Sequence, residues 1–246
     1  MTGNTGPVGL VTGGLSGIGA ACAIEFGRLG ARLLLADRSP LGGEELVERV
    51  RAAGGDAAIE TLDVRDPDAQ ERSAARAVRE WGRIDFLIAN AGVAEQSSLA
   101  TGDPAHWRTV VETNLLGVLY SCRAVLPTML DQDSGHIFVM ASVSGRESYA
   151  GEPVYAATKW AQVGLAHALR LELIETRIRV TVLEPGLVDT PLTRENPKIR
   201  PLLDEIEPLS AGDVARAVVY AFQQPEHVAV TEVVVRPQAQ RLLRIE

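Results

Sequence analysis

The sequence predicts an α/β fold: one domain, residues 1–246, built on a doubly wound, seven-stranded and mostly parallel sheet with helices on both faces. Three observations lead to this fold class. Short apolar runs alternate with helical patterns along the whole chain, which is typical of βαβ units. Most of these runs are rich in Val, Ile, Leu and Ala without polar alternation, as in strands buried on both faces. The first run leads directly into a glycine-rich turn and a helix.

The same patterns place each element in order. The predicted strands are Val8–Val11, Arg32–Ala36, Ala57–Leu62, Ile84–Ala89, His136–Ala141, Arg179–Leu183 and Val230–Val235. The predicted helices are Gly17–Leu29, Leu41–Ala53, Pro67–Trp81, Pro104–Leu130, Pro153–Glu175 and Ala211–Gln223. Asp66, Asp103 and Ser210 each precede a helical pattern, and such side chains are typical N-caps. The Pro-rich, charged stretch 189–208 follows the sixth strand, and we interpret it as a substrate lid, a loop with a short helix.

Composition and charge disfavour several functional classes. Acidic residues number 32 against 24 Lys and Arg, a formal net charge of −8, whereas proteins that bind nucleic acids or membrane surfaces favour basic surfaces. No apolar stretch reaches the roughly 18 residues of a membrane span, and the first ten residues lack the features of a signal peptide. Two cysteines without a C-x-x-C pair and four scattered histidines predict no metal site. We therefore expect a cytoplasmic protein without nucleic-acid, membrane or metal partners.

The turn after the first strand, TGGLSGIG, is typical of a phosphate cradle. Glycines permit a tight turn and close approach of the backbone to a pyrophosphate, and the helix N-terminus supplies N–H groups and a positive dipole end. A glycine-rich turn without a ligand is the alternative, but the position at the start of a βαβ unit argues against it. The residues predicted to form this Rossmann-like cradle are Gly13, Leu15, Ser16, Gly17, Ile18 and Gly19.

Polar residues end the next three strands, where ligands of doubly wound sheets bind. Asp37 ends the second strand and is predicted to accept hydrogen bonds from the adenosine ribose, which favours NAD(H) over NADP(H). Arg38 follows it and is suited to a 2′-phosphate, so NADP(H) is the alternative cofactor. Asp63 is expected to face the adenine amino group. The adenosine-binding residues predicted after the third and fourth strands are Asp63, Val64, Asn90, Ala91 and Gly92.

A tyrosine, a lysine and a serine form the predicted catalytic group. Tyr155 and Lys159 are spaced i, i+4 on a predicted helix, so the phenol and the ammonium share one helix face. A free phenol titrates at about 10. A nearby ammonium and a positive nicotinamide stabilise the phenolate and lower that pKa, which suits an acid/base at neutral pH. Ser142 ends the fifth strand and is placed to hold the substrate oxygen. Alone, the Tyr/Lys spacing occurs by chance in many proteins, and a serine such as Ser142 is more typical of a helix cap. Together with the glycine loop, the three residues predict hydride transfer.

With these motifs, the chain resembles the compact form of the short-chain dehydrogenase/reductase family over nearly its whole length. The family's loop, NAG motif and catalytic residues match Thr12, Gly13, Gly17, Gly19, Asn90, Ala91, Gly92, Asn114, Ser142, Tyr155 and Lys159. The resemblance implies that Asn114 binds, through its backbone carbonyl, a water joined to Lys159 and so completes a proton relay. It also implies a nicotinamide-binding segment formed by Pro185, Gly186, Val188 and Thr190. Ala89 and Glu184 depart from the family's common asparagines, at positions that carry no chemistry.

We therefore predict an NAD(P)-dependent oxidoreductase that interconverts a secondary alcohol and a ketone or aldehyde, with a small hydroxy compound as substrate. Tyr155 is the predicted acid/base, Lys159 orients the nicotinamide ribose, and Ser142 binds the reacting oxygen. The resemblance implies hydride transfer to the pro-S face of the nicotinamide. A non-catalytic NAD(H)-sensing regulator and an epimerase, dehydratase or dehalogenase of the same fold are the alternatives. The intact glycine loop and Tyr/Lys pair argue against both.

The predicted substrate pocket mixes small apolar groups with two carboxylates, which either face a polar or cationic substrate or are solvated at the rim. Its lining is Ala94, Glu95, Val143, Ser144, Tyr149, Glu152, Gly186, Leu187 and Leu192. The short lid favours a small substrate over a steroid or acyl-carrier substrate. The stretches AGEPVYAATK and VAVTEVVVRPQAQ resemble those of small hydroxy-acid and broad alcohol dehydrogenases. The resemblance further implies a homotetramer or homodimer, with the two longest helices paired across a two-fold axis.

Overall fold

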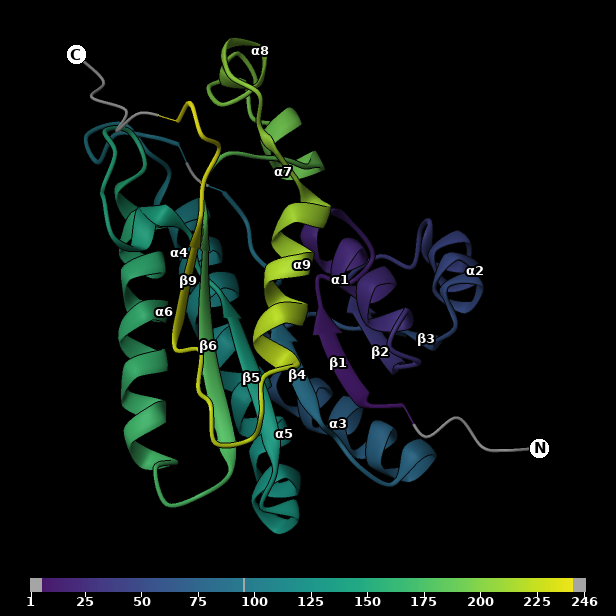
Figure 1. The fold of residues 1–246 in the computed structure, drawn as a ribbon. Coiled ribbons are helices and arrows are strands. Elements are labelled where there is room, and N and C mark those ends of the chain that lie inside the picture. The colour runs from purple at the N-terminus through teal and green to yellow at the C-terminus, as the bar shows by residue number, and fades with distance from the viewer. Residues whose placement is uncertain (1–5, 95, 241–246) are drawn as a thin grey trace.

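A seven-stranded sheet forms the centre of the computed structural model, which describes residues 6–94 and 96–240 (Figure 1). The strands run parallel in the order β3-β2-β1-β4-β5-β6-β9. They are β1 (Val8–Thr12), β2 (Arg32–Asp37), β3 (Asp56–Thr61), β4 (Phe86–Ala89), β5 (Gly135–Met140), β6 (Ile178–Pro185) and β9 (Glu232–Val235). The predicted α/β fold class is confirmed, with a sheet that is entirely parallel in the described chain.

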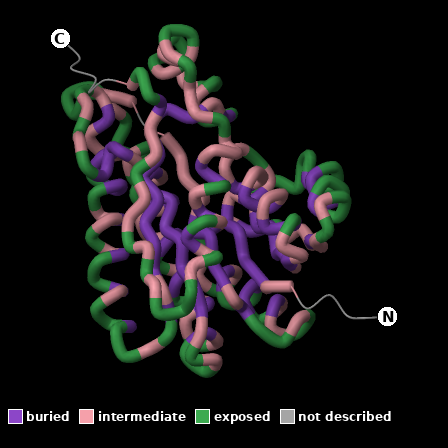
Figure 2. The backbone as a smooth tube through the Cα atoms, in the orientation of Figure 1, coloured by how far each residue is buried: buried purple, intermediate pink, exposed green. Residues whose placement is uncertain are grey.

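Helices cover both faces of this sheet and divide the apolar core into two halves. One face carries α1 (Gly17–Gly27), α2 (Gly43–Ala53) and α9 (Ala211–Phe222), and the other carries α3 (Pro67–Trp81), α5 (Gly117–Gln132) and α6 (Pro153–Glu172). Phe26 and Val218 lie in the first half of the core, and Val125 and Leu169 lie in the second. Figure 2 shows the strands as the most buried part of the chain. This two-sided burial explains why the strand sequences lack polar alternation.

The predicted capping residues act as expected. Asp66 accepts hydrogen bonds from the backbone of Asp68 and Ala69 at the start of α3, and Ser210 forms a capping box with Asp213 at the start of α9. Most predicted boundaries differ by one to three residues, as fraying ends do. The largest correction is α6, which ends at Glu172 rather than Glu175. Shifts of two residues occur at the starts of β9 (Glu232, not Val230), β4 (Phe86, not Ile84) and α2 (Gly43, not Leu41), and at the ends of α1 (Gly27, not Leu29) and β6 (Pro185, not Leu183).

The helix predicted over 104–130 is interrupted. It consists of α4 (Pro104–Val111), a π-helical turn η1 (Glu112–Leu116) and α5. The turn contains Asn114, whose side chain is held by the backbone of Val93 instead of lying against solvent. Such π turns insert one extra residue per turn and are frequent at functional sites. The deviation from α-helix therefore falls at the asparagine that the family resemblance marks as a site residue.

The stretch predicted as a lid holds two short helices, not one. These are α7 (Pro191–Arg194) and α8 (Leu202–Glu205), which lie over the carboxyl ends of the strands at the top of Figure 1. The two-residue strands β7 (Val188–Asp189) and β8 (Leu209–Ser210) pair and join the two ends of this segment. Residues 189–208 thus form a segment whose two ends are held together by paired strands, rather than an open loop.

The strand order reverses between β1 and β4, and ligands of doubly wound sheets bind in the crevice beyond that point.

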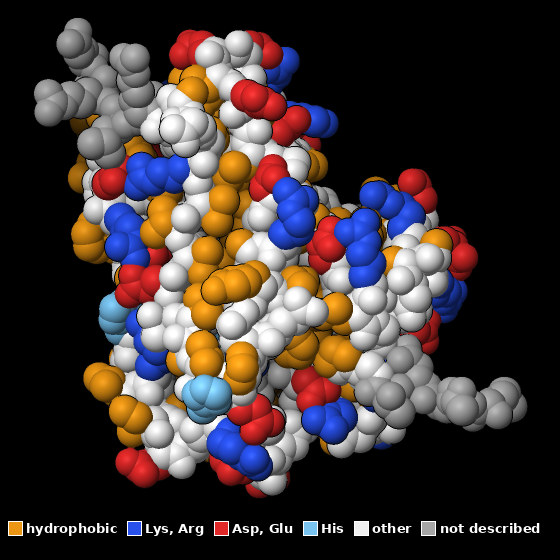
Figure 3. All heavy atoms as spheres, viewed as in Figure 1, with side chains coloured by type: hydrophobic (Ala, Val, Ile, Leu, Met, Phe, Trp, Pro, Cys, Tyr) orange, Lys and Arg blue, Asp and Glu red, His pale blue; other side chains and the backbone are white. Residues whose placement is uncertain are grey.

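Charged side chains of both signs are interspersed over the face seen in Figure 3. Within the described ranges, no helix is both long enough and apolar enough to cross a bilayer.

Candidate active site

The glycine loop between β1 and α1 is shaped by its backbone. Gly13 and Gly17 have φ values of +60° and +52°, a region that side chains with a Cβ rarely adopt. A Cβ on Gly19 would lie 2.2 Å from the Gly13 carbonyl oxygen, so helix and loop approach too closely for any side chain there. Ser16, the N-cap of α1, is extended and makes no side-chain hydrogen bond to the first turn. The first N–H groups of a helix have no partner within the helix, and Ser16 does not cap them, so this helix end suits an anion.

Asn90 supports this loop from the end of β4. Its Nδ2 donates to the carbonyls of Thr12 (3.1 Å) and Gly13 (3.0 Å). The Thr12 hydroxyl in turn accepts from the backbone N–H groups of Asn90 and Ala91, at 3.1 and 3.2 Å. Two strand ends are thus fastened to each other across the switch point. Asn90 and Ala91 sit beside the cradle as predicted, and the Asn90 side chain supports the loop itself.

The predicted adenosine end carries mixed charge. Asp37 ends β2, and its carboxylate accepts a long hydrogen bond from the backbone N–H of Leu15, at 3.4 Å. Asp63 is engaged by the Arg65 guanidinium at 2.6 Å, and this hydrogen bond holds the pKa of the Asp63 carboxyl below its ordinary value, with a smaller contribution from the charge of Arg38. Two arginines therefore stand near the acids on this side of the crevice. Val64 is buried beside them.

The three predicted catalytic side chains come from β5 and α6. Ser142 follows β5 as the N-cap of a 3₁₀ turn, η2 (Val143–Gly145), where its hydroxyl accepts from the backbone N–H of Ser144 at 3.1 Å. Tyr155 and Lys159 lie one turn apart on α6, and the Lys159 Nζ lies 5.5 Å from the centre of the Tyr155 ring. The buried Lys159 ammonium donates to the Met140 carbonyl at 2.8 Å. The predicted i, i+4 pair therefore shares one helix face beside the end of β5.

The electrostatics of this group differ from the prediction. Burial raises the pKa of the Tyr155 phenol, the nearby Glu152 carboxylate raises it further, and a hydrogen bond with Ser142 lowers it. Burial also lowers the pKa of the Lys159 ammonium to about 7. The sequence predicts that Lys159 and a positive nicotinamide together lower the Tyr155 pKa. Lys159 is not among the causes of the Tyr155 shift: its ammonium donates to backbone and amide oxygens, and burial lowers its own pKa. Tyr155 in this state is a phenol, a proton donor.

Asn114 occupies a network that links the π turn to two other segments. Its side chain accepts from the Val93 N–H (2.8 Å) and donates to the Val93 carbonyl (2.9 Å) and to Thr158 (3.3 Å). Its backbone carbonyl, to which the resemblance assigns a water, accepts a hydrogen bond from the Gln162 side chain. The other end of the Gln162 amide contacts Lys159. The Gln162 side chain therefore connects Asn114 with Lys159 directly.

The segment after β6 closes the crevice from the other side. The Thr190 side chain lies 3.4 Å from the position that a Cβ on Gly17 would take, so this segment reaches the glycine loop. Val188 and Thr190 are buried, and the Thr190 hydroxyl lies 3.2 Å from that of Thr193. Pro185 and Gly186 precede them at the end of β6. The predicted nicotinamide segment and the predicted phosphate loop therefore border one space.

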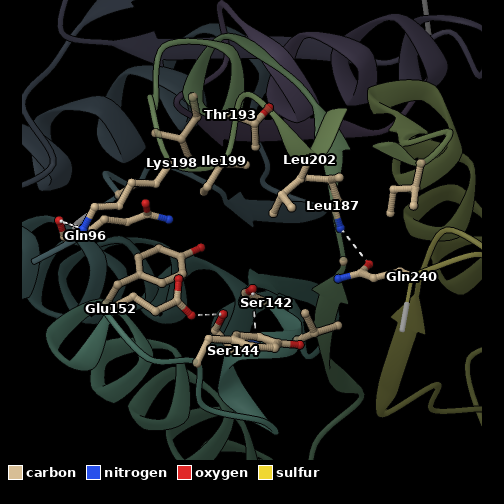
Figure 4. Close-up of a pocket in the computed structure, with 18 of the residues that line it drawn as sticks. Gln96, Ser142, Ser144, Glu152, Leu187, Thr193, Lys198, Ile199, Leu202 and Gln240 are labelled. Carbon is tan, nitrogen blue, oxygen red and sulfur yellow. Dashed lines mark hydrogen bonds between the residues drawn. The ribbon is translucent and has the colours of Figure 1, made fainter. Parts of the chain in front are cut away.

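A cavity of about 400 Å³ lies beside this group, between Ser142 and Ser144 on one side and the lid on the other (Figure 4). Of the predicted pocket residues, those that line it are Ala94, Val143, Ser144, Tyr149, Glu152, Gly186, Leu187 and Leu192. Glu95 lies outside the described residues. The Ser144 hydroxyl donates to the Glu152 carboxylate at 2.7 Å, and Glu152 is only 8% exposed. Glu152 is thus part of the pocket wall rather than a solvated rim charge.

Several further residues that line the cavity were not predicted from the sequence. They include Gln96, Thr193, Lys198, Ile199, Leu202, Ile206 and Gln240. Ile199, Leu202 and Ile206 have the i, i+3, i+7 spacing of an apolar helix face, but only Leu202 lies in α8, and Ile206 is extended. Gln240 accepts a hydrogen bond from the Leu187 backbone N–H at 3.0 Å, and no local pattern predicts this contact because it joins segments 53 residues apart.

The residues present fit a dinucleotide. The cradle would clash with a Cβ at Gly13 or Gly19, its helix end offers N–H donors, and Asp37 stands at the next strand end. Backbone donors at a helix N-terminus suit a pyrophosphate, and a carboxylate at the end of β2 suits ribose hydroxyls. When bound, a nicotinamide dinucleotide supplies the hydride acceptor or donor.

Comparison with known proteins agrees with this geometry. A family model described as short chain dehydrogenase matches residues 7–200. An uncharacterized oxidoreductase of Staphylococcus saprophyticus is 37% identical over 232 residues, which are 94% of this chain and 97% of that protein. The closed form of serine dehydrogenase complexed with NADP+ has a TM-score of 0.88 and 32% identity, and covers 97% of this chain and 98% of its own. An alcohol dehydrogenase from the archaeon Thermococcus sibiricus, complexed with 5-hydroxy-NADP, has a TM-score of 0.86 and 27% identity, with coverages of 96% and 98%.

Proposed function

Because the chain belongs to the short-chain dehydrogenase family and is an oxidoreductase, we propose that it interconverts a small secondary alcohol and its ketone or aldehyde by nicotinamide-dependent hydride transfer. One observation carries the proposal: Ser142 and Tyr155 line a single cavity, and Lys159 lies behind Tyr155 on the same helix. An acid/base, a hydrogen-bond donor for the reacting oxygen and a cation therefore converge beside the dinucleotide cradle.

Tyr155 moves the proton in this proposal. In reduction, the phenol donates its proton to the substrate oxygen; in oxidation, the phenolate accepts the carbinol proton as hydride leaves the carbon. Ser142 holds the same oxygen by a hydrogen bond and so orients the reacting carbon. Lys159 contributes positive charge near the developing phenolate. The raised pKa of Tyr155 supports a resting state that is ready for reduction.

The substrate proposal rests on the shape and chemistry of the cavity. About 400 Å³ suits a small hydroxy compound, and the lid contributes the apolar side chains of Ile199 and Leu202 to its wall. Glu152 and Lys198 add one acidic and one basic group, so a substrate with polar substituents is accommodated. The likeness to serine dehydrogenase and to an alcohol dehydrogenase supports the same substrate size.

We propose NAD(H) as the preferred cofactor, with NADP(H) as the alternative. Asp37 supports NAD(H), because a carboxylate at the end of β2 repels a 2′-phosphate. Arg38, which follows it, and Arg65, which engages Asp63, are cations suited to that phosphate, and the two solved structures compared above are complexes with NADP+ or a derivative of NADP. The Asp37 variant discussed below separates these two cofactors.

The proposed function is tested by following nicotinamide absorbance with both cofactors and a panel of small alcohols and ketones. We expect turnover with at least one small secondary alcohol, and we expect Tyr155→Phe to reduce kcat by about 10²–10⁴-fold while cofactor binding is retained. Tight cofactor binding without turnover across the panel would point instead to a sensor. Full activity of Tyr155→Phe would remove Tyr155 as the acid/base.

We also propose a homotetramer or homodimer in the cytoplasm. Several large apolar side chains on α5 and α6 are exposed in the monomer, among them Leu119 (37%), Trp160 (50%) and Leu171 (72%). Their burial against a second copy is favourable. The free, buried thiols of Cys22 and Cys122 support a reducing compartment. Light scattering of the purified protein measures the number of subunits.

A further inference from the structure

A buried glutamine stands directly behind the catalytic lysine. Gln162 lies on α6 three residues after Lys159, so the two side chains share one helix face. Gln162 is fully buried, with 0% exposure. Its Oε1 accepts a hydrogen bond from the Lys159 Nζ at 3.1 Å, and its Nε2 donates to the backbone carbonyl of Asn114. The amide thus joins α6 to the π turn.

The chemistry of the two neighbours permits only this orientation of the amide. An ammonium only donates hydrogen bonds, and a backbone carbonyl only accepts them, so the oxygen of Gln162 must face Lys159 and the nitrogen must face Asn114. Asn114 is itself fastened to Val93, in the loop that follows β4. Lys159, Gln162, Asn114 and Val93 therefore form a continuous chain of hydrogen bonds from the catalytic helix to the edge of the cofactor crevice.

This chain restrains a flexible cation. A lysine stem is a flexible chain of four methylene groups, and ordering it costs side-chain entropy. The Met140 carbonyl and the Gln162 amide accept hydrogen bonds from two of the three ammonium N–H groups. Gln162 is neutral, so it restrains the ammonium without cancelling its charge. A carboxylate in its place would cancel that charge.

We propose that Gln162 is a positioning residue for the reaction: it ties the Lys159 ammonium to the backbone of the π turn at Asn114, and thereby sets the place and the charge of this cation beside Tyr155. The proposal rests on the proposed function, because it assigns Lys159 a role in proton transfer at Tyr155. It predicts that removing the amide and replacing it by a carboxylate have opposite effects on the titration of Lys159.

The groups around Lys159 allow the effect of position 162 on the titration of Lys159 to be measured separately. Tyr155 faces it from α6, β5 presents the uncharged Met140 carbonyl, and the π turn is reached through Gln162. Burial is the cause of the low Lys159 pKa, and no charged side chain of the described residues adds to it. A change at position 162 therefore acts on Lys159 without passing through another ionisable group.

The experiment compares Gln162→Met, which keeps the length of the side chain, with Gln162→Glu, which keeps an acceptor and adds charge. Gln132→Met is the matched control, because Gln132 makes three hydrogen bonds to the backbone of Ile84 and Ser134 at the opposite end of the sheet. For each variant, kcat and KM are measured against pH, and thermal stability of the cofactor-free protein is measured against pH.

We expect Gln162→Met to lower kcat about tenfold or more, the effect of losing one hydrogen bond to a charged group, with less than a threefold change in KM. The pH above which the thermal stability rises should move down in Gln162→Met and up in Gln162→Glu. Gln132→Met should lose stability while kcat stays within about twofold. Shifts of the same sign in both Gln162 variants, or kcat within twofold of wild type in Gln162→Met, would overturn the proposal.

The kinetic and thermal measurements distinguish a failure of the proposed function from a failure of the positioning role of Gln162. If the wild-type protein shows no turnover, the proposed function fails, and the thermal arm alone still shows whether Gln162 sets the charge of Lys159. If the wild type turns over and Gln162→Met behaves as Gln132→Met does, the function stands and the positioning role fails. If Gln162→Met does not fold, the sign of the shift in Gln162→Glu decides, since an unshifted or lowered profile contradicts the proposal.

Discussion

The two sides of the crevice are built differently. On the cofactor side, backbone geometry defines the site: Gly13 and Gly19 exclude any Cβ, and Asn90 fastens two strand ends to each other. On the substrate side, side chains define it: Ile199 and Leu202 reach the cavity from a lid whose two ends are joined by the paired two-residue strands β7 and β8. A site made of backbone accepts one kind of ligand, whereas a wall of exchangeable side chains adapts to many.

Lys159→Met tests the point where the two sides meet, and we expect the largest effect there. Turnover should fall by about 10²–10⁴-fold, because the cation beside Tyr155 is lost. Stability should change in the opposite direction. Burial lowers the Lys159 pKa from 10.5 to about 7, so the unfolded chain binds a proton that the folded chain lacks between these values, and wild-type stability rises with pH in this window.

The variant lacks that proton linkage, so its gain in melting temperature over wild type should be greatest below pH 7, a few degrees, and should shrink toward pH 10.5. Thermal melts of both proteins across this range measure it. An equal difference at every pH would show that Lys159 is not a strained buried cation, and unimpaired turnover would separate it from the chemistry.

Gly19→Ala tests whether backbone geometry defines the cofactor side of the crevice. The new Cβ would meet the Gly13 carbonyl oxygen at 2.2 Å, so helix and loop must separate, and we expect cofactor affinity to fall by about a hundredfold or more. Gly164→Ala is the control, since a Cβ there meets no atom within 4 Å. That helix variant should gain about 0.5–1 kcal/mol of stability with unchanged binding. Titration of each protein with NADH and NADPH gives both affinities, and equal affinities in the two variants would contradict the close approach.

The same contrast explains what the sequence predicted and what it did not. The glycine loop and the buried strands leave local signals, because a positive φ favours glycine and two-sided burial favours unbroken apolar runs. The bonds of Gln162 and Gln240 leave none: a glutamine in a helix or a tail is usually solvated, and only the assembled fold brings these two to Lys159 and Leu187. The β7–β8 pairing is likewise two residues long and too short for any sequence pattern.

Asp37→Ala tests whether one side chain on the cofactor side sets cofactor choice. Removing the carboxylate from the end of β2 relieves the repulsion of a 2′-phosphate and removes an acceptor for ribose hydroxyls. We expect the ratio of kcat/KM for NAD to that for NADP to fall about tenfold, mostly through a higher KM for NAD. Arg38→Ala should move the ratio the other way if this arginine meets the phosphate. An unchanged ratio in Asp37→Ala would show that Asp37 is not the selector.

Leu202→Ala tests the adaptable side, and we expect the smallest effect there. Leu202 lines the cavity from α8 and is half-buried, so truncation removes a few apolar contacts with a substrate without disturbing the core. The substrate KM should rise about two- to fivefold, and cofactor affinity should not change. Leu130→Ala, at an exposed position near the end of α5, should leave both unchanged. Loss of cofactor affinity in Leu202→Ala would mean that the lid holds the cofactor as well, and that the two sides of the crevice are not independent.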